Sequence, residues 1–261
     1  MGPKITPRRS EDRGHFDLDW LDTYHTFSFD EYYDHNFTGF GALKVINEDL
    51  IKPGKGFGKH DHEEFEIFTY MLSGELRHQD SLGNTEILRR GDIQFTTSGS
   101  GITHSETNAS SRHNCKLLQI WTQPDGDGKR LAPAYQTMGF SDARKLNTFL
   151  RVVAPAREGD GDAIAVHADL SVYAGILEPG RGAGVVAKEG LGEDGRRRTK
   201  RGYVHVANFG GTGEVVVWGR EGEVVLREGD GAFVREWRVG EELGFEARKG
   251  RNVEVLVFDL A

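Results

Sequence analysis

Residues 65–74 read Phe-Glu-Ile-Phe-Thr-Tyr-Met-Leu-Ser-Gly, and this stretch decides the fold class. Aromatic and β-branched side chains are typical of a β-strand, and the final Ser-Gly pair is typical of a turn. Further short runs follow, separated by turn residues at 81–84 and 90–92, so that strands recur about every ten residues. This rhythm predicts an antiparallel sandwich or barrel.

The C-terminal part of the chain has the same pattern of strands and turns. Gly-Glu at 74–75 precedes Gly-Asp at 91–92 by 17 residues, and Gly-Glu at 213–214 precedes Gly-Asp at 229–230 by 16 residues. Similar offsets predict one structural unit that occurs twice, with chance matching of glycine turns as the alternative. Helices are scarce, because no long stretch has apolar residues at helical spacing.

The length of 261 residues is close to the limit at which a single core stops growing, so two domains are expected. We predict an N-terminal domain at 1–135, a linker at 136–165 and a C-terminal domain at 166–261. The linker is interrupted by turn residues and contains one predicted short helix, from Ser141 as N-cap through Leu150.

The composition excludes several classes of partner. The formal net charge is −8 and the acidic residues are scattered, so we expect no direct contact with nucleic acid. Cys115 is the only cysteine, which excludes an internal disulfide and a thiolate metal cluster. The N-terminal residues do not read as a secretory signal and no apolar run has the length of a bilayer span, so we expect no membrane contact and a cytoplasmic or nuclear location.

Four residues carry the expected chemistry. His60 and His62 are two residues apart, and so are His104 and Glu106, so on extended strands each pair projects to one face. Three imidazoles and one carboxylate suit a divalent transition metal, whereas Ca²⁺ and Mg²⁺ prefer oxygen ligands. Taken alone, the first pair could be two surface histidines that have this spacing by chance. The second pair, with the same spacing, favours a metal site.

The N-terminal half resembles the pirin family over nearly its whole length. The matching motifs are Arg-Gly-His at 13–15, Trp-Leu-Asp at 20–22, His-Thr-Phe-Ser-Phe at 25–29, Tyr-Tyr-Asp at 32–34, Gly-Phe-Gly at 39–41, Val-Ile-Asn-Glu-Asp at 45–49, Gly-Lys-His-Asp-His at 58–62, Asp-Ser-Leu-Gly-Asn at 80–84, Arg-Gly-Asp-Ile-Gln at 90–94 and Gly-Ile-Thr-His-Ser-Glu at 101–106.

The resemblance implies an all-β bicupin, with two cupin (jelly-roll β-barrel) domains in tandem and few short helices. It also implies that His60, His62, His104 and Glu106 hold one metal, with Fe(II) expected and Ni, Cu, Mn or Zn as alternatives. Several pirins are quercetinases, which open the central ring of a flavonol with dioxygen and release carbon monoxide. Some eukaryotic pirins are non-catalytic transcription cofactors, so an iron-dependent regulatory protein with a protein partner is the alternative function.

The sequence departs from the family pattern beside the first ligand pair. Asp61 replaces the usual proline, and Glu63 follows His62, so negative charge is added near the expected metal. Glu66 lies where many single cupins place a carboxylate ligand and competes with Glu106, which the pirin resemblance favours. The C-terminal copy has only His205 near the corresponding position, so we expect no metal site there.

The leading functional hypothesis is a dioxygenase in which Glu106 accepts the proton of a flavonol-like aromatic substrate. Apolar walls are expected from four phenylalanines, Phe40, Phe65, Phe68 and Phe95. The basic run at 196–201 is interpreted as a solvated loop or, in the regulatory alternative, as a nuclear import signal or a patch for an acidic partner.

Overall fold

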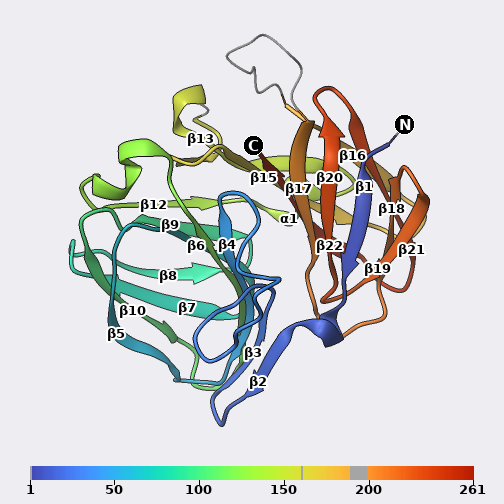
Figure 1. The fold of residues 1–261 in the computed structure, drawn as a ribbon. Helices are drawn as coiled ribbons and strands as arrows, with labels where there is room; N and C mark the ends of the chain where they lie inside the picture. Colours follow the sequence, from blue (N-terminus) through green and yellow to red (C-terminus); the bar gives the residue numbers. More distant parts are fainter. Residues whose placement is uncertain (1, 160, 189–198) are drawn as a thin grey trace. The chain divides into compact units, whose positions relative to one another are not determined.

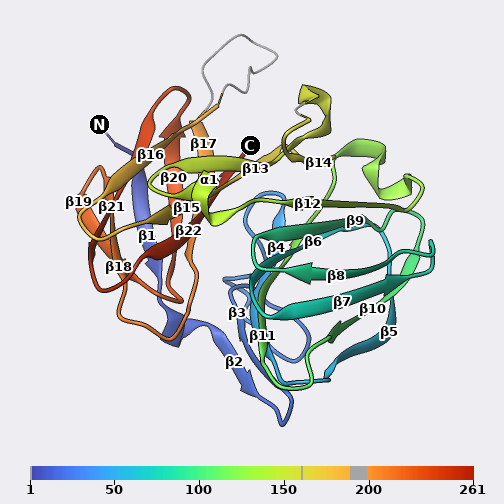
Figure 2. The same ribbon diagram turned by 180° about the vertical axis from the view of Figure 1, so that it is seen from behind.

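The computed structural model describes residues 2–159, 161–188 and 199–261, and most of its regular elements are β-strands (Figure 1, and Figure 2 from behind). The chain forms two compact units. We call Arg13–Phe140 with Pro155–Asp169 the first barrel, and Met1–Asp12 with Ser141–Ala154 and Leu170–Ala261 the second barrel. The predicted domain boundaries at 135 and 166 stay a prediction, because each unit combines segments that are far apart in the sequence.

The first barrel consists of a large and a small antiparallel sheet. The large sheet contains, in spatial order, β12 (Ala134–Gly139), β9 (Asp92–Thr97), β6 (Glu66–Ser73), β11 (Cys115–Thr122), β4 (Leu43–Ile51), β3 (Leu21–His25) and β2 (Gly14–Asp17). The small sheet contains β5 (Gly56–His62), β10 (Ile102–Asn108), β7 (Glu75–Asp80) and β8 (Thr85–Arg89). The short elements of this unit are η2 (Gly126–Arg130), η3 (Ala156–Glu158) and β14 (Ile164–Val166).

Alternation of side chains along the strands decides which residues reach the barrel interior. Strand β10 alternates strictly between buried and half-buried residues, and its buried positions include His104 and Glu106. Successive side chains of a strand point to opposite faces, so these two residues share the inner face. One end of the interior is filled by an apolar cluster that includes Met71 and Leu117.

The second barrel has the same two-sheet plan. Its large sheet contains β1 (Lys4–Arg8), β20 (Gly231–Arg238), β17 (Thr199–Val206), β22 (Val253–Leu260), β15 (Leu170–Leu177) and β13 (Phe149–Pro155). Its small sheet contains β16 (Gly182–Val186), β21 (Glu242–Lys249), β18 (Glu214–Gly219) and β19 (Gly222–Arg227). The helical elements of this unit are η1 (Ser10–Asp12) and α1 (Asp142–Lys145).

The order of strands confirms the repeat and the all-β, two-cupin fold predicted from the sequence. The series β9-β6-β11-β4-β3 in one barrel corresponds to β20-β17-β22-β15-β13 in the other, and β5-β10-β7-β8 corresponds to β16-β21-β18-β19. Strand β1, from the start of the chain, pairs with β20 in the place that β12 takes beside β9. One copy of the repeat is therefore completed by a segment distant in sequence.

The connector differs from the prediction made from the sequence. The helix predicted from Ser141 through Leu150 is only α1, four residues long, and Asn147 just beyond it has a positive φ of 54°. Such a backbone cannot continue a right-handed helix.

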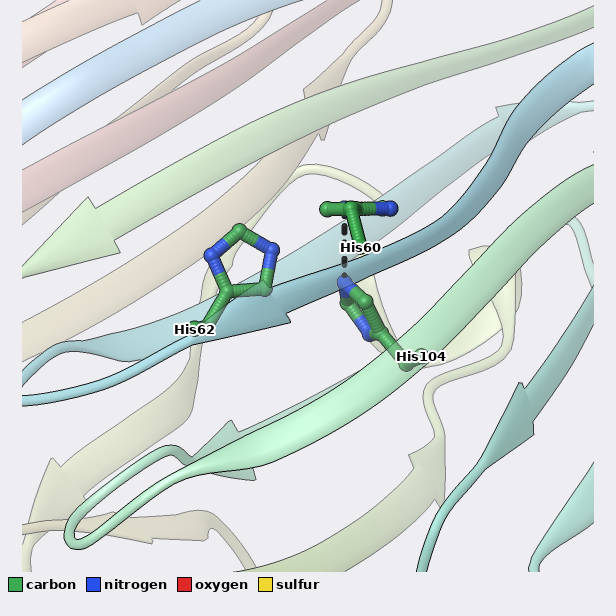
Figure 3. Close-up of side chains that lie close together, drawn as sticks. All are labelled: His60, His62 and His104. Carbon is green, nitrogen blue, oxygen red and sulfur yellow. Dashed lines mark hydrogen bonds between the residues drawn. The ribbon is translucent and has the colours of Figure 1, made fainter.

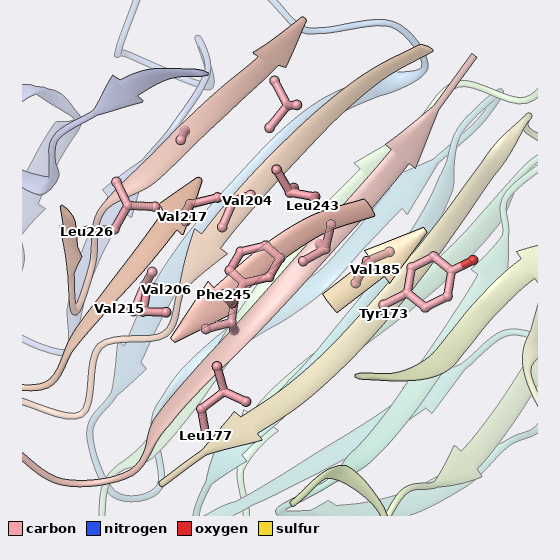
Figure 4. Close-up of a cluster of buried hydrophobic side chains, with 14 of the residues drawn as sticks. Tyr173, Leu177, Val185, Val204, Val206, Val215, Val217, Leu226, Leu243 and Phe245 are labelled. Atoms are coloured by element: carbon pink, nitrogen blue, oxygen red, sulfur yellow. The ribbon is translucent and has the colours of Figure 1, made fainter. Parts of the chain in front are cut away.

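The interior of the second barrel is filled by apolar side chains, among them Val204, Val217 and Phe245 (Figure 4).

Candidate metal centre

Three histidines meet inside the first barrel. Strands β5 and β10 pair antiparallel, with His60 opposite His104 and His62 opposite Ile102. The ligand nitrogens of His60, His62 and His104 lie within 4.8 Å of one another, and Figure 3 shows the three rings gathered between the two strands. The spacing of two residues in the first pair thus does place both rings on one face.

A β-bulge in β5 orients the first of these rings. Phe57 and His60 are three residues apart, yet they pair with Glu106 and His104, which are two apart. The carbonyl oxygen of Gly58, between the two paired positions, lies 2.7 Å from His60 Nδ1. A proton on Nδ1 satisfies this contact and leaves the Nε2 lone pair free, which is the arrangement that metal-bound histidines adopt.

The donor atoms fit a transition metal. His60 Nε2 and His104 Nε2 are 3.1 Å apart, so either a proton or a cation must lie between their lone pairs. Two nitrogens bound at right angles to one ion at about 2.1 Å are themselves about 3.0 Å apart. Burial, with repulsion from His104 and His60, lowers the pKa of His62 to about 4, and burial also lowers the pKa of His104. Neutral imidazole is the form that binds metals.

Glu106 lies beside this triad and is held by three side chains. Gln119 Nε2 donates to Glu106 Oε2 at 2.7 Å, while the Thr69 hydroxyl lies 3.0 Å from Glu106 Oε1 and the Gln94 amide donates to the same oxygen. The carboxylate does not join the 4.8 Å group of His60, His62 and His104. Its place as fourth ligand therefore stays a prediction.

His78 is a further candidate that the sequence analysis did not single out. His78, His104 and Glu106 are all buried and their ligand atoms lie within 4.8 Å of one another. His78 Nε2 is 3.1 Å from Asp80 Oδ2, and His78 Nδ1 has no hydrogen-bond partner among the described residues. His78 stands within a strand two residues before Asp80, and nothing in that local pattern distinguishes it from a structural histidine.

Glu66, the competing carboxylate, points elsewhere. Its carboxylate accepts hydrogen bonds from the His167 backbone N–H at 3.0 Å and lies 2.6 Å from His167 Nδ1. Burial raises the pKa of Glu66 although the His167 contacts oppose the shift. Neither cluster of metal-ligating side chains in the described residues includes it.

A row of inward polar residues crosses the large sheet and was not predicted. Directly paired positions on β3, β4, β11, β6 and β9 carry one polar residue each. We call this set the polar row: His25, Asn47, Gln119, Thr69 and Gln94. Thr69 and Gln119 stand inside the apolar runs of β6 and β11, and this is the local signal that could have found them, since buried polar groups need hydrogen-bond partners.

Aromatic side chains surround the histidines, but they are not all the predicted ones. Trp121 stands edge-on to His62 with ring centroids 4.8 Å apart, and Phe65 is 5.4 Å from Trp121. Phe68 and Phe95 are paired neighbours of Thr69 and Gln94, which point at Glu106. Because side chains alternate, Phe68 and Phe95 face the other way, so the prediction that they line the site is wrong.

The surface beside His62 is acidic. A hollow of about 490 Å³ is lined by His62 together with Asp61 and Glu63, which are both exposed. The Asp61 carboxylate accepts a hydrogen bond of 2.5 Å from the Thr103 hydroxyl. Asp61 and Thr103 stand between the inward positions of β5 and β10, so their side chains point to the outer face of the small sheet and not at the histidines.

The second barrel has no histidine on β16 or β21, the strands that correspond to β5 and β10. The expectation that it holds no metal stays a prediction. Residues 196–198 of the basic run lie outside the described residues. Within the ranges that the structure describes, no helix has the length and apolar character needed to cross a membrane.

Comparisons with known proteins give a consistent result. The pirin family model, described as Pirin, matches residues 7–122. The quercetin 2,3-dioxygenase of Escherichia coli (strain K12) is 44% identical over 167 residues, which are 64% of this chain and 69% of that protein. The crystal structure of YhhW from Escherichia coli has a TM-score of 0.84 at 34% identity and covers 99% of this chain and 98% of YhhW. A crystal structure of the bacterial pirin YhhW in complex with nickel(II) has a TM-score of 0.82 at 34% identity and covers 98% of this chain and 99% of that one.

Proposed function

Because the chain belongs to the pirin family, we propose that it is a metal-dependent dioxygenase that opens the central ring of quercetin or a related flavonol. The observation that carries this proposal is the convergence of His60, His62 and His104, with the 3.1 Å contact between two ring nitrogens. A relative that is 44% identical is named quercetin 2,3-dioxygenase, which supports the choice of substrate.

The metal is proposed to bind through His60, His62, His104 and Glu106, with Fe(II) expected and Ni, Cu, Mn or Zn as alternatives. The related YhhW structure with nickel(II) supports a divalent transition metal. Glu106 is next to His104 on the inner face of β10, and its carboxylate lies within 4.8 Å of a ring nitrogen of His104, which supports it as the fourth ligand.

A bound divalent metal would supply a Lewis-acidic centre that favours the deprotonated form of a flavonol hydroxyl and its reaction with dioxygen. The protein's own contribution is orientation and a proton acceptor. Glu106 is held on both oxygens by Thr69, Gln94 and Gln119, which fixes the carboxylate for accepting the hydroxyl proton. With 2% of its surface exposed, Glu106 works away from bulk water.

The proposed reaction is balanced without another reductant. Both atoms of dioxygen enter the ring-opened ester, while one ring carbon leaves with its own oxygen as carbon monoxide. The substrate hydroxyl proton passes to Glu106 and returns to the product, so the enzyme ends each cycle unchanged.

The test is turnover by the metal-loaded protein. Fe(II), Ni, Cu, Mn or Zn is loaded in turn, quercetin is supplied under air, and oxygen uptake and carbon monoxide release are followed together with metal content. We expect His62→Ala to lose metal and activity together, because one imidazole ligand is removed. The matched control is His35→Ala, since His35 is exposed in the same barrel and lies outside the metal-ligating clusters.

Each outcome separates the hypotheses. Full metal content in His62→Ala would remove His62 from the ligand set. A wild-type protein that binds metal but shows no turnover with any of the five metals would favour the non-catalytic regulatory alternative, in which the metal changes affinity for a protein partner.

A further inference from the structure

A second feature of the first barrel is a pocket of about 190 Å³ at the β2–β3–β4 end of its interior. Its apolar walls include the rings of Phe16, Phe29 and Phe57. Its polar lining comes from Asn47 and Asp49 on β4 and from residues of β3 opposite them. An apolar pocket with a few convergent polar groups is the usual form of a small-molecule site.

Some polar atoms that line the pocket form no hydrogen bond within the described part of the protein. His25 Nδ1 lies 2.7 Å from Asn47 Oδ1, and the Thr23 hydroxyl donates to Asp49 Oδ1 at 2.5 Å. Within the described residues, no side chain or backbone group bonds to His25 Nε2, Asn47 Nδ2 or Asp49 Oδ2. Buried polar groups normally find a partner, so these atoms can take one from a ligand.

The residues that line the pocket are neighbours of the metal centre. His25 and Asn47 are one end of the polar row, and Asn47 is paired with Gln119, which donates to Glu106. On the opposite side, the Phe57 ring that walls the pocket has its centroid 6.3 Å from that of His60. The pocket and the histidines are thus separated by single side chains, Gln119 on one side and Phe57 on the other.

Size and charge define what fits. An apolar cavity of about 150 Å³ is large enough to bind benzene, so this pocket holds one substituted ring and is too small for the three rings of a flavonol. Asp30 and Glu31 also line it and are exposed. Carboxylates at the entrance oppose an anionic ligand and accept a neutral phenol.

We propose that this pocket is a binding subsite for one neutral, hydroxylated aromatic ring, with its hydroxyl bonded by Asp49, Asn47 or His25. Its assignment as the place for the substrate ring remote from the metal rests on the proposed function. Binding of the ring itself does not, because it needs neither metal nor turnover.

The test uses the metal-free full chain and two probes that lack the metal-chelating hydroxyl beside the carbonyl: 4′-hydroxyflavone and unsubstituted flavone. We expect calorimetry to give tighter binding of 4′-hydroxyflavone. We expect Asp49→Leu to lower the affinity for 4′-hydroxyflavone at least tenfold and to change the affinity for flavone less than twofold, because only the hydroxyl group loses its hydrogen-bond partner. The control is Asp127→Leu, at an exposed position in η2, which should change neither affinity.

A second measurement needs no variant. Nuclear Overhauser contacts from bound 4′-hydroxyflavone to the rings of Phe57 and His25 are expected in the wild-type protein. Their absence at saturation would overturn the inference, as would equal affinity of wild type and folded Asp49→Leu for 4′-hydroxyflavone. Binding of 4′-hydroxyflavone in this pocket without quercetin turnover would support the subsite and contradict the dioxygenase proposal. Quercetin turnover with a KM that Asp49→Leu does not change would support the dioxygenase and contradict the subsite.

Discussion

Replacement of Gln119 by leucine tests whether the polar row holds the metal centre in place. Leucine is close to glutamine in volume but cannot donate a hydrogen bond. The change removes the 2.7 Å bond to Glu106 Oε2 and the contact of 3.0 Å between the Thr69 hydroxyl and Gln119 Oε1. The three histidines and their strands are untouched.

The size of the effect follows from the kind of bond that is lost. A hydrogen bond to a charged group is worth about 1.5–3 kcal/mol, and loss of a partner that orients a metal ligand lowers metal affinity about 10–100-fold. That fall corresponds to about 1.4–2.7 kcal/mol of binding free energy. With Glu106 as the proposed fourth ligand, we therefore expect Gln119→Leu to bind the metal about 10–100 times more weakly while still folding.

The assay is competition for Ni²⁺ or Zn²⁺ against a fluorescent chelator, together with thermal unfolding of the metal-free protein. Gln136→Leu is the matched control, because Gln136 is half-buried in the same barrel and its amide bonds to the Ala165 backbone at 3.1 Å and 3.3 Å, away from Glu106. Equal metal affinities for the wild type and Gln119→Leu would refute the reasoning, and so would an equal loss in both variants.

Two further predictions concern stability. Gly56 has a φ of +155°, and an added Cβ would lie 2.3 Å from the backbone oxygen of Glu106. Gly56→Ala should therefore lower the free energy of unfolding in urea by about 1–3 kcal/mol. Gly58→Ala is the control and should lower it little, because the space around its added Cβ is open. Burial raises the pKa of Asp49 to about 7 from 3.8, so the folded state holds this proton more tightly and wild-type stability falls as pH rises between these values. Asp49→Asn should lack this loss of about 2–3 kcal/mol between pH 5 and pH 8, and parallel pH profiles of the two proteins would contradict the assignment.

Local patterns predicted the strands and their repetition well. Within the run at 65–74, Glu66–Ser73 form β6, and the Gly-Glu and Gly-Asp offsets mark corresponding strands in the two barrels. A strand is recognisable from its own residues, because its side-chain alternation and its turns are local features. For the same reason, the spacing of His60 and His62 was enough to predict that both share a face.

The missed features depend on pairing between distant segments. The polar row exists only because five strands are aligned in one register, and no short stretch of sequence contains that alignment. The error about Phe68 and Phe95 has a related cause, since a one-residue difference in facing moves a side chain from the interior to the other face. His78 was missed because its neighbours in space, His104 and Glu106, are more than twenty residues away in the chain.

The bulge at Gly58–Lys59 separates the identity of the candidate ligands from their donor strength. Loss of one of these two residues would leave Phe57 and His60 an even number of positions apart, so both rings would still enter the interior. Only the carbonyl contact to His60 Nδ1 would change, and with it the electron density that Nε2 can offer. Evolution or a designer could thus adjust the donor strength of His60 by shortening the strand while His60, His62 and His104 are all conserved.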